Sequence, residues 1–299
     1  MCPVIEMKHK LQGSIALGLA TVIWGSAFIA QSVGMDHIGP ITFLASRNAL
    51  AVPFLMLLAF LFDRKKTDYW KLWINKKLWL SGFSCGLALF AAASLQQIGM
   101  VYTSAGKSGF LTAMYIVLVP VLGLFLKKKP SINAWFSVGL AVIGLYLLSC
   151  AGVSKVNIGD ILLLGCAFAF AVQILLIDRA GSDLDGLRLN CIQSLVVAVI
   201  STACMFLFET PNWESIRISW LPISYAGILS TGVAYSLQIV GQKQLPPAPA
   251  SLIMSLESVF AVLCGWLILK EQLTGWEMAG CVLVFSAVIL SQIPLNKQD

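Results

Sequence analysis

The sequence predicts an all-α membrane protein, with ten transmembrane helices arranged as two inverted five-helix repeats. Hydrophobic residues make up 58% of its 299 residues, and charged residues only 11%. About a quarter of the residues of a typical soluble domain are charged, so a soluble protein of this length could not hide so much apolar surface. The strands of a membrane barrel alternate apolar and polar residues, whereas these segments are apolar throughout. Helices are therefore expected, because backbone in lipid must satisfy its hydrogen bonds within the segment.

Ten segments are long and apolar enough to cross the hydrocarbon, which takes roughly 20 residues of helix. The expected spans are residues 13–33, 41–62, 78–99, 104–126, 133–150, 158–178, 188–208, 219–240, 249–269 and 275–293. The loops between them are short, and the longest, residues 63–77, leaves no room for a separate soluble domain. We expect Pro120 to bend the fourth span, because proline removes a helical hydrogen bond.

A weak internal repeat relates two halves, residues 1–150 and 151–299, which meet at a short polar joint. The fragment SLQQIG at 94–99 recurs as SLQIVG at 236–241, 142 residues further on. The same offset aligns Val117 with Val259, Gly123 with Gly265 and Lys128 with Lys270, and a slightly larger one aligns Gly13, Ile15 and Leu17 with Gly159, Ile161 and Leu163. Each half has an odd number of spans, so the second half must enter the bilayer from the opposite side. Inverted repeats of this kind hold a ligand near the bilayer midplane, where the halves meet.

The formal charge of +6 has a topological explanation. With the N-terminus in the cytoplasm, fifteen of the 20 Lys and Arg residues fall on cytoplasmic segments and three on the opposite side. This positive-inside bias predicts that both termini are cytoplasmic. The charge therefore requires no acidic partner, and we expect no nucleic-acid partner.

The sequence lacks the metalloprotease and nucleotide-binding motifs of common enzymes. It contains no H-E-x-x-H and no phosphate-binding loop of the form G-x-x-x-x-G-K-[ST]. G-x-S-x-G occurs at residues 82–86, inside an expected span, where Gly82 and Gly86 also form a G-x-x-x-G that indicates close helix packing. Its two histidines, His9 and His37, lie outside the spans, and its eight cysteines include no C-x-x-C pair. We expect no catalytic residue, no metal site and no cofactor. The alternatives to a carrier are a membrane-embedded enzyme, or a sensor or scaffold that has a carrier fold without transport.

Three charged side chains stand out among those inside the predicted spans, because a charge at the bilayer centre costs about 2.5–3.5 kcal/mol. Arg47 could bind a substrate carboxylate or phosphate with its planar guanidinium, or it could reach the interface or cap carbonyls freed by Pro53. Lys107 could reach the outer interface, or the small residues around it could admit a ligand. Glu257, near the midplane, is the candidate for proton coupling, with a structural ion pair as the alternative.

Uncharged polar and aromatic residues complete the candidate site. Together with Arg47 and Lys107, the predicted substrate-binding residues are Trp24, Gln96, Tyr115, Gln173, Tyr235 and Gln238. A single amide at this depth can equally be a hydrogen bond between helices. Gln96 and Gln238 are stronger candidates, because the repeat places them in equivalent positions.

Several short motifs, in this order and spacing, are those of a known family. They are WGSAF at 24–28, Arg47, TSA at 103–105, GFL at 109–111, ASLI at 250–253, SLE at 255–257 and LILKEQLT at 267–274. The chain thus resembles the EamA family of the drug/metabolite transporter superfamily over nearly its whole length. The family commonly has proline after the glutamate at position 257, where this chain has Ser258, so the local bend there is not implied by the resemblance.

The resemblance implies ten helices, cytoplasmic termini and export or exchange of small metabolites. With two basic groups and one acid available, the predicted site suits a zwitterionic or anionic metabolite, such as an amino acid. We therefore expect a secondary transporter that works by alternating access in the bacterial plasma membrane, and that could act as a homodimer.

Overall fold

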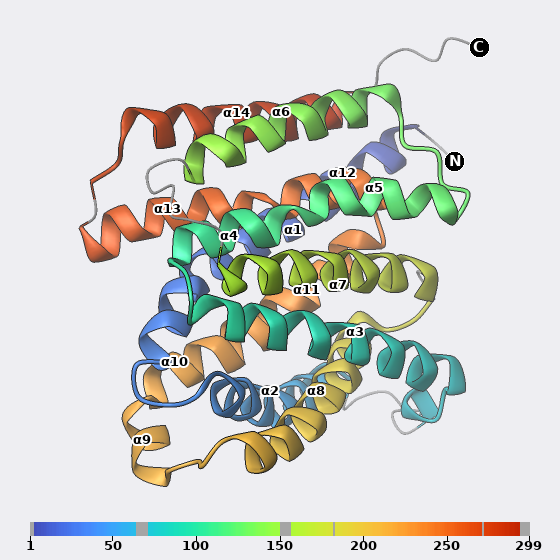
Figure 1. The fold of residues 1–299 in the computed structure, drawn as a ribbon. Helices are drawn as coiled ribbons and strands as arrows, with labels where there is room; N and C mark the ends of the chain where they lie inside the picture. The colour runs from blue at the N-terminus through green and yellow to red at the C-terminus, as the bar shows by residue number, and fades with distance from the viewer. Residues whose placement is uncertain (1–2, 64–70, 150–156, 182, 271, 294–299) are drawn as a thin grey trace.

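The computed structural model describes residues 3–63, 71–149, 157–181, 183–270 and 272–293. All regular elements within these ranges are helices (Figure 1). Nine helical spans within these ranges are long and apolar enough to cross a membrane, three of them made of two or more consecutive helices, and the span expected at 133–150 is a shorter apolar helix. The prediction of an all-α protein with many spans is therefore confirmed. The joint between the halves, at 151–156, lies outside the described residues.

The first half runs from α1 to α6. Its helices are α1 (Pro3–Gly34), α2 (Pro40–Asp63), η1 (Lys71–Trp73), α3 (Lys76–Met100), α4 (Ala105–Ala113), α5 (Tyr115–Phe125) and α6 (Ile132–Ser149). Side chains cap two of these helices: Asn75 accepts hydrogen bonds from the first amides of α3, and Ser104 accepts one from an amide of α4. Such caps satisfy N–H groups that the start of a helix leaves unpaired.

The second half runs from α7 to α14. Its helices are α7 (Ile158–Ala180), α8 (Gly186–Phe208), α9 (Trp213–Ile218), α10 (Trp220–Ser224), η3 (Tyr225–Ala234), α11 (Tyr235–Gln242), α12 (Pro247–Met254), α13 (Leu256–Leu269) and α14 (Gly275–Gln292). Across the halves, α2 packs against α8 and α6 packs against α14, and Figure 1 shows these pairs near opposite edges of the bundle. The remaining long helices fill the space between the two pairs.

Equivalent helices of the two halves run in opposite directions. Gly13, near the start of the membrane-crossing part of α1, packs against Gly241 at the end of α11. Lys243, just beyond α11, donates a hydrogen bond to the carbonyl of Leu184, just beyond the end of α7. This part of α1 and the end of α7 therefore lie on the same side of the bundle, as an inverted repeat requires.

Two glycine contacts repeat this inverted relation in the packing. A Cβ added to Gly13 would lie 3.0 Å from the carbonyl oxygen of Gly241, and one added to Gly159 would lie 2.7 Å from the carbonyl oxygen of Gly99. The internal repeat aligns Gly13 with Gly159, and Gly99 with Gly241. The lack of a side chain lets the helix backbones approach closely, which is how small residues join helices in membranes.

Two spans that we expected as single helices are interrupted at equivalent places. The span at 104–126 breaks at Met114, whose amide bonds the carbonyl of Leu111 at 3.3 Å; α5 then continues through Pro120, at which we expected the bend. The span at 249–269 breaks at Ser255, whose hydroxyl donates a hydrogen bond of 2.7 Å to the carbonyl of Leu252. A serine hydroxyl bonded to a carbonyl one turn back often bends a helix, so this break needs no proline.

The span expected at 219–240 also contains an irregular section. Its middle, η3, is a π-helix between α10 and α11. π-Helical segments are rare and often occur at functional sites.

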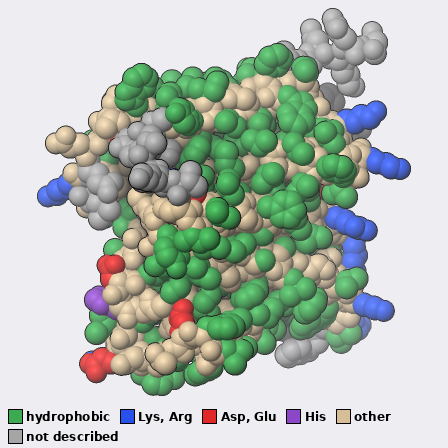
Figure 2. All heavy atoms as spheres, in the orientation of Figure 1, with side chains coloured by type: hydrophobic (Ala, Val, Ile, Leu, Met, Phe, Trp, Pro, Cys, Tyr) green, Lys and Arg blue, Asp and Glu red, His purple; other side chains and the backbone are tan. Residues whose placement is uncertain are grey.

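Charged side chains gather at two edges of the molecule. Figure 2 shows most of the visible Lys and Arg side chains at one edge and acidic side chains with a histidine at the other, separated by a broad apolar surface. The first and last long helices meet on one side, since Ser14 of α1 donates a hydrogen bond of 3.5 Å to Gln292 of α14. We call this side of the bundle the terminal side. An apolar belt with basic residues concentrated at one edge is typical of a multi-pass membrane protein.

Candidate functional site

A cavity with an empty volume of about 460 Å³ lies between the two halves. Its wall consists of Trp24, Phe28 and Gln31 from α1, Arg47 from α2, Gln96 from α3, Tyr115 from α5, Phe170 and Ile174 from α7, Ser230 from η3, Tyr235 and Gln238 from α11, Met254 from α12 and Glu257 from α13. Sites for small molecules are lined mostly by apolar and aromatic side chains with a few polar groups. The lining of this cavity therefore suits a small organic molecule.

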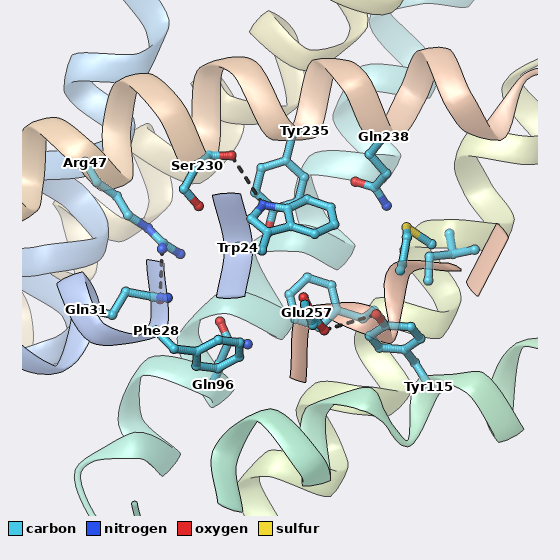
Figure 3. A pocket seen from close by; sticks show the side chains of 13 residues that line it. Trp24, Phe28, Gln31, Arg47, Gln96, Tyr115, Ser230, Tyr235, Gln238 and Glu257 are labelled. Atoms are coloured by element: carbon cyan, nitrogen blue, oxygen red, sulfur yellow. Dashed lines mark hydrogen bonds between the residues drawn. The ribbon is translucent and has the colours of Figure 1, made fainter. Parts of the chain in front are cut away.

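Arg47 provides a buried cation on one side of the cavity (Figure 3). The residue is 4% exposed, and its Nη1 donates a hydrogen bond of 3.0 Å to Oε1 of Gln31. Its Nε is buried without a hydrogen-bond partner among the described residues. Because the partner that it does have is a neutral amide, the guanidinium keeps donors for an anionic group, which it can hold by two parallel hydrogen bonds.

Glu257 provides a buried carboxyl on the other side of the cavity (Figure 3). It is 6% exposed, and its Oε1 accepts a hydrogen bond of 3.0 Å from the hydroxyl of Tyr115. The two residues are 142 positions apart, so the internal repeat places them in equivalent positions of the two halves. The inverted repeat thus brings the first turns of α5 and α13 together at the cavity.

The interrupted spans also direct helix N-termini toward the cavity. Tyr115 is the first residue of α5, and Glu257 is the second residue of α13. The N-terminus of a helix carries a partial positive charge, which stabilises a nearby anion within the first turn. Discontinuous helices of this kind form ligand sites in many carriers.

Aromatic side chains shape the wall between the two charged groups. The indole N–H of Trp24 donates a hydrogen bond of 3.4 Å to the carbonyl of Ser230, and the Trp24 ring lies 5.0 Å from that of Tyr235, centroid to centroid. Tyr115 packs edge-on against Phe170, with ring centroids 6.4 Å apart. Such rings hold their positions by mutual contact and present rigid faces to a ligand.

A chain of amides supports one wall of the cavity. Gln238 donates a hydrogen bond of 3.2 Å to Gln173, which donates one of 3.3 Å to Gln193, which in turn donates one of 2.9 Å to Asn190. Oε1 of Gln238 is buried and has no partner within the described residues. The chain therefore fixes the side chain of Gln238 and leaves an acceptor free at the cavity.

The structure brings most of the predicted site residues together. Seven of them line the cavity: Trp24, Arg47, Gln96, Tyr115, Tyr235, Gln238 and Glu257. Gln173 lies one hydrogen bond behind Gln238. Lys107 is placed elsewhere, because its ammonium forms an ion pair of 2.8 Å with Asp160 at the start of α7.

Six lining residues were not predicted: Phe28, Gln31, Phe170, Ile174, Ser230 and Met254. A signal existed for the first two, since Trp24, Phe28 and Gln31 are spaced by four and three residues and so share one face of α1. Phe170, Ile174 and Met254 are ordinary apolar residues of membrane helices, which sequence alone does not distinguish. Within the described ranges, no group of three or more His, Cys, Asp and Glu residues could hold a metal ion.

Comparison with known proteins places these features in a family. The model of the EamA-like transporter family matches the chain twice, over residues 11–150 and 157–292, which confirms the resemblance seen in the motifs. An uncharacterized transporter of Archaeoglobus fulgidus is 33% identical over 289 residues, which cover 95% of this chain and 87% of that protein. The uncharacterized transporter YoaV of Bacillus subtilis is 25% identical, over 95% of this chain and 98% of its own length.

Two further similarities are more limited. The threonine/homoserine exporter RhtA of Escherichia coli is 31% identical over 185 residues, which cover 60% of each protein. A solved structure that is 15% identical superposes with a TM-score of 0.78, over 94% of this chain and 96% of that one, and shares the fold.

Proposed function

Since this chain belongs to the EamA-like transporter family, we propose that it is a secondary transporter of a small zwitterionic metabolite, such as an amino acid, which it moves by alternating access. The observation that carries the proposal is the pair of buried, opposite charges in one cavity between inverted halves. The carboxylate of the metabolite binds the free donors of Arg47, and its ammonium group binds the carboxylate of Glu257. Both interactions involve ionised groups in a setting from which water is largely excluded, where such hydrogen bonds are strong.

The polar groups of the cavity and one relative favour a small polar amino acid. RhtA, with which the chain shares 31% identity over part of its length, is named as an exporter of threonine and homoserine. In our proposal the unpaired Oε1 of Gln238 accepts a hydrogen bond from the ammonium or hydroxyl group of such a cargo.

The placement in the membrane completes the proposal. The shorter apolar helix α6 is the tenth span, pairing with α14, and both termini are cytoplasmic in a bacterial plasma membrane. The basic residues gathered at one edge in Figure 2 support this orientation, because positive charge is retained on the cytoplasmic side. A homodimer stays a prediction.

Binding of amino acids to the purified protein tests the proposed cargo. At 100 times its Kd, a ligand that binds only the folded state stabilises it by about 2.7 kcal/mol, so we expect threonine or homoserine to raise the midpoint of thermal unfolding in detergent. Threoninol lacks the carboxylate and 2,3-dihydroxybutyrate lacks the ammonium group, and neither should stabilise the protein to the same extent. Equal stabilisation by all four compounds would contradict a zwitterion site, and stabilisation only by nucleosides or organic anions would assign another cargo.

A further inference from the structure

Two ion pairs join the halves along one seam, which is the contact of α4 and α5 with α7. Lys107 of α4 pairs with Asp160 of α7 at 2.8 Å, and Lys128, just beyond α5, pairs with Asp178 of α7. In both pairs the lysine belongs to the first half and the aspartate to the second. Any separation of the halves along this seam must therefore break one or both pairs.

The two pairs lie at opposite ends of the seam, with the cavity between them. Asp160 and Asp178 are 18 residues apart on α7, which corresponds to about 27 Å along the helix at 1.5 Å per residue. Phe170 and Ile174, which line the cavity, lie between them on the same helix. Asp178 is near the end of α7 and so lies toward the terminal side, whereas Asp160 lies toward the opposite side.

Among the described residues, the equivalent seam, where α1 meets α12 and α13, has no ion pair that matches these two. At the repeat offsets, the positions of Lys107 and Asp160 are occupied by Pro249 and Ser14, and the position of Asp178 is occupied by Ser32. This seam is instead closely packed against backbone, because a Cβ added to Gly25 of α1 would lie 2.7 Å from the carbonyl carbon of Phe260 and 2.8 Å from the amide nitrogen of Ala261. The two seams therefore differ: one is held by charges that can separate, and the other by close packing.

A second hollow opens at the terminal end of the ionic seam. Its empty volume is about 960 Å³, and it is lined by Lys128 and Asp178 together with Val119 of α5, Leu175 of α7 and the segment 246–249, PPAP. Ile174 lines the central cavity and Asp178, one turn further along the same face of α7, lines this hollow, so the two spaces follow one another along the helix. We call this hollow the vestibule.

We propose that cargo passes between the vestibule and the central cavity along the α5–α7 seam, and that the Lys128–Asp178 ion pair is the gate at this end, with Lys107–Asp160 as the gate at the other. This inference rests on the proposed transport function and adds the route to it. Both pairs are formed in the structure, so in our proposal both gates are shut in this conformation. Opening toward the terminal side separates Lys128 from Asp178, and the two freed charges can meet the carboxylate and the ammonium group of an approaching amino acid.

The partial exposure of the Lys128–Asp178 pair suits a gate. The side chains of Lys128 and Asp178 are 38% and 20% exposed, and those of Lys107 and Asp160 are 17% and 8% exposed. A partly exposed ion pair contributes roughly 0–1 kcal/mol, so thermal motion can separate it readily. Water screens the more deeply buried charges at the other end less, so their attraction is stronger and that gate should open less readily.

Labelling of a cavity cysteine from each side of the membrane tests the gates. Met254→Cys places a reporter in the cavity wall, in a variant whose native cysteines are replaced by serine or alanine. A membrane-impermeant thiol reagent is applied to intact spheroplasts or to inside-out vesicles. Asp178→Asn should raise the labelling rate by about two- to fivefold from the cytoplasmic side only, the change in open population that corresponds to losing such a pair.

The other end of the seam supplies the matched control. Asp160→Asn should raise the labelling rate from the outer side only. For the gate on the terminal side, the exchanged pair Lys128→Asp with Asp178→Lys should restore the labelling rate of the native pair. Equal rates from both sides in every variant would overturn the proposal, as would a failure of the exchanged pair to restore closure. Should Asp178→Asn not elute as a single folded species, Lys128→Gln tests the same gate. The reporter needs no cargo, so its result is independent of whether amino acids bind.

Discussion

Replacing Arg47 with alanine should weaken amino-acid binding by about 10- to 100-fold and abolish transport at ordinary cargo concentrations. The buried guanidinium has a free Nε and shares only Nη1 with the neutral Gln31. A hydrogen bond to a charged group contributes about 1.5–3 kcal/mol, which corresponds to this loss of affinity. The measurement is the cargo concentration that half-saturates thermal stabilisation, together with uptake into proteoliposomes.

Two control variants separate binding from folding. Arg47→Lys keeps the charge but loses the planar fork, so it should bind cargo more weakly than the native protein and better than alanine. Arg217→Ala makes the same change at a side chain that is 82% exposed on α9, and it should leave binding unchanged. Unaltered affinity in well-folded Arg47→Ala would remove Arg47 from the site.

Glutamine at position 257 should uncouple transport from the proton gradient. Glu257 is the only carboxyl side chain in the described lining of the cavity. No other carboxylate in that lining could therefore bind a proton that is carried through this site. The substitution keeps an oxygen that can accept the hydrogen bond from Tyr115 and removes the group that titrates. We expect exchange of cargo across the membrane to continue at reduced affinity while accumulation driven by a pH difference disappears.

The size of this effect follows from the stoichiometry. If one proton moves against one cargo molecule, each unit of pH difference supports about tenfold accumulation, since one unit corresponds to 1.36 kcal/mol. Uptake of labelled amino acid into proteoliposomes, with and without an imposed pH difference, measures this accumulation ratio. Tyr115→Phe is the control, because it removes the hydrogen bond and keeps the acid, and it should retain accumulation. Accumulation of the same size in Glu257→Gln would exclude Glu257 as the coupling group.

The internal repeat made some spatial relations predictable, because it aligns equivalent residues of the two halves. The offset of 142 residues that aligns Gly99 with Gly241 also aligns Tyr115 with Glu257, and the structure joins this last pair by a hydrogen bond. The prediction of membrane helices was reliable because composition alone requires it. Seven of the nine predicted site residues line one cavity because polar groups are rare inside a membrane protein and gather where water or a ligand can meet them.

The positions of two residues show what the sequence could not provide. Lys107 belongs to the same expected span as Tyr115, which lines the cavity. Its ammonium nevertheless pairs with Asp160, which is 53 residues away in the other half. In a soluble protein, the polar face of a helix indicates which side faces outward. A membrane helix is apolar both where it meets lipid and where it meets protein, so its hydrophobic pattern does not determine how the helix is rotated about its axis. The break at Met114 carries no glycine or proline, and it became visible only in the backbone hydrogen bonds.

Counterflow into proteoliposomes tests most directly whether the chain is a carrier with one cavity reached from both sides. Vesicles loaded with unlabelled threonine are diluted into a trace of labelled threonine, and the label inside is followed over time. We predict a transient rise of the internal label above its equilibrium level, absent from protein-free vesicles and from Arg47→Ala. A trace that never exceeds equilibrium with threonine, homoserine or any other amino acid, from protein that remains folded in the vesicles, would contradict amino-acid exchange through this cavity.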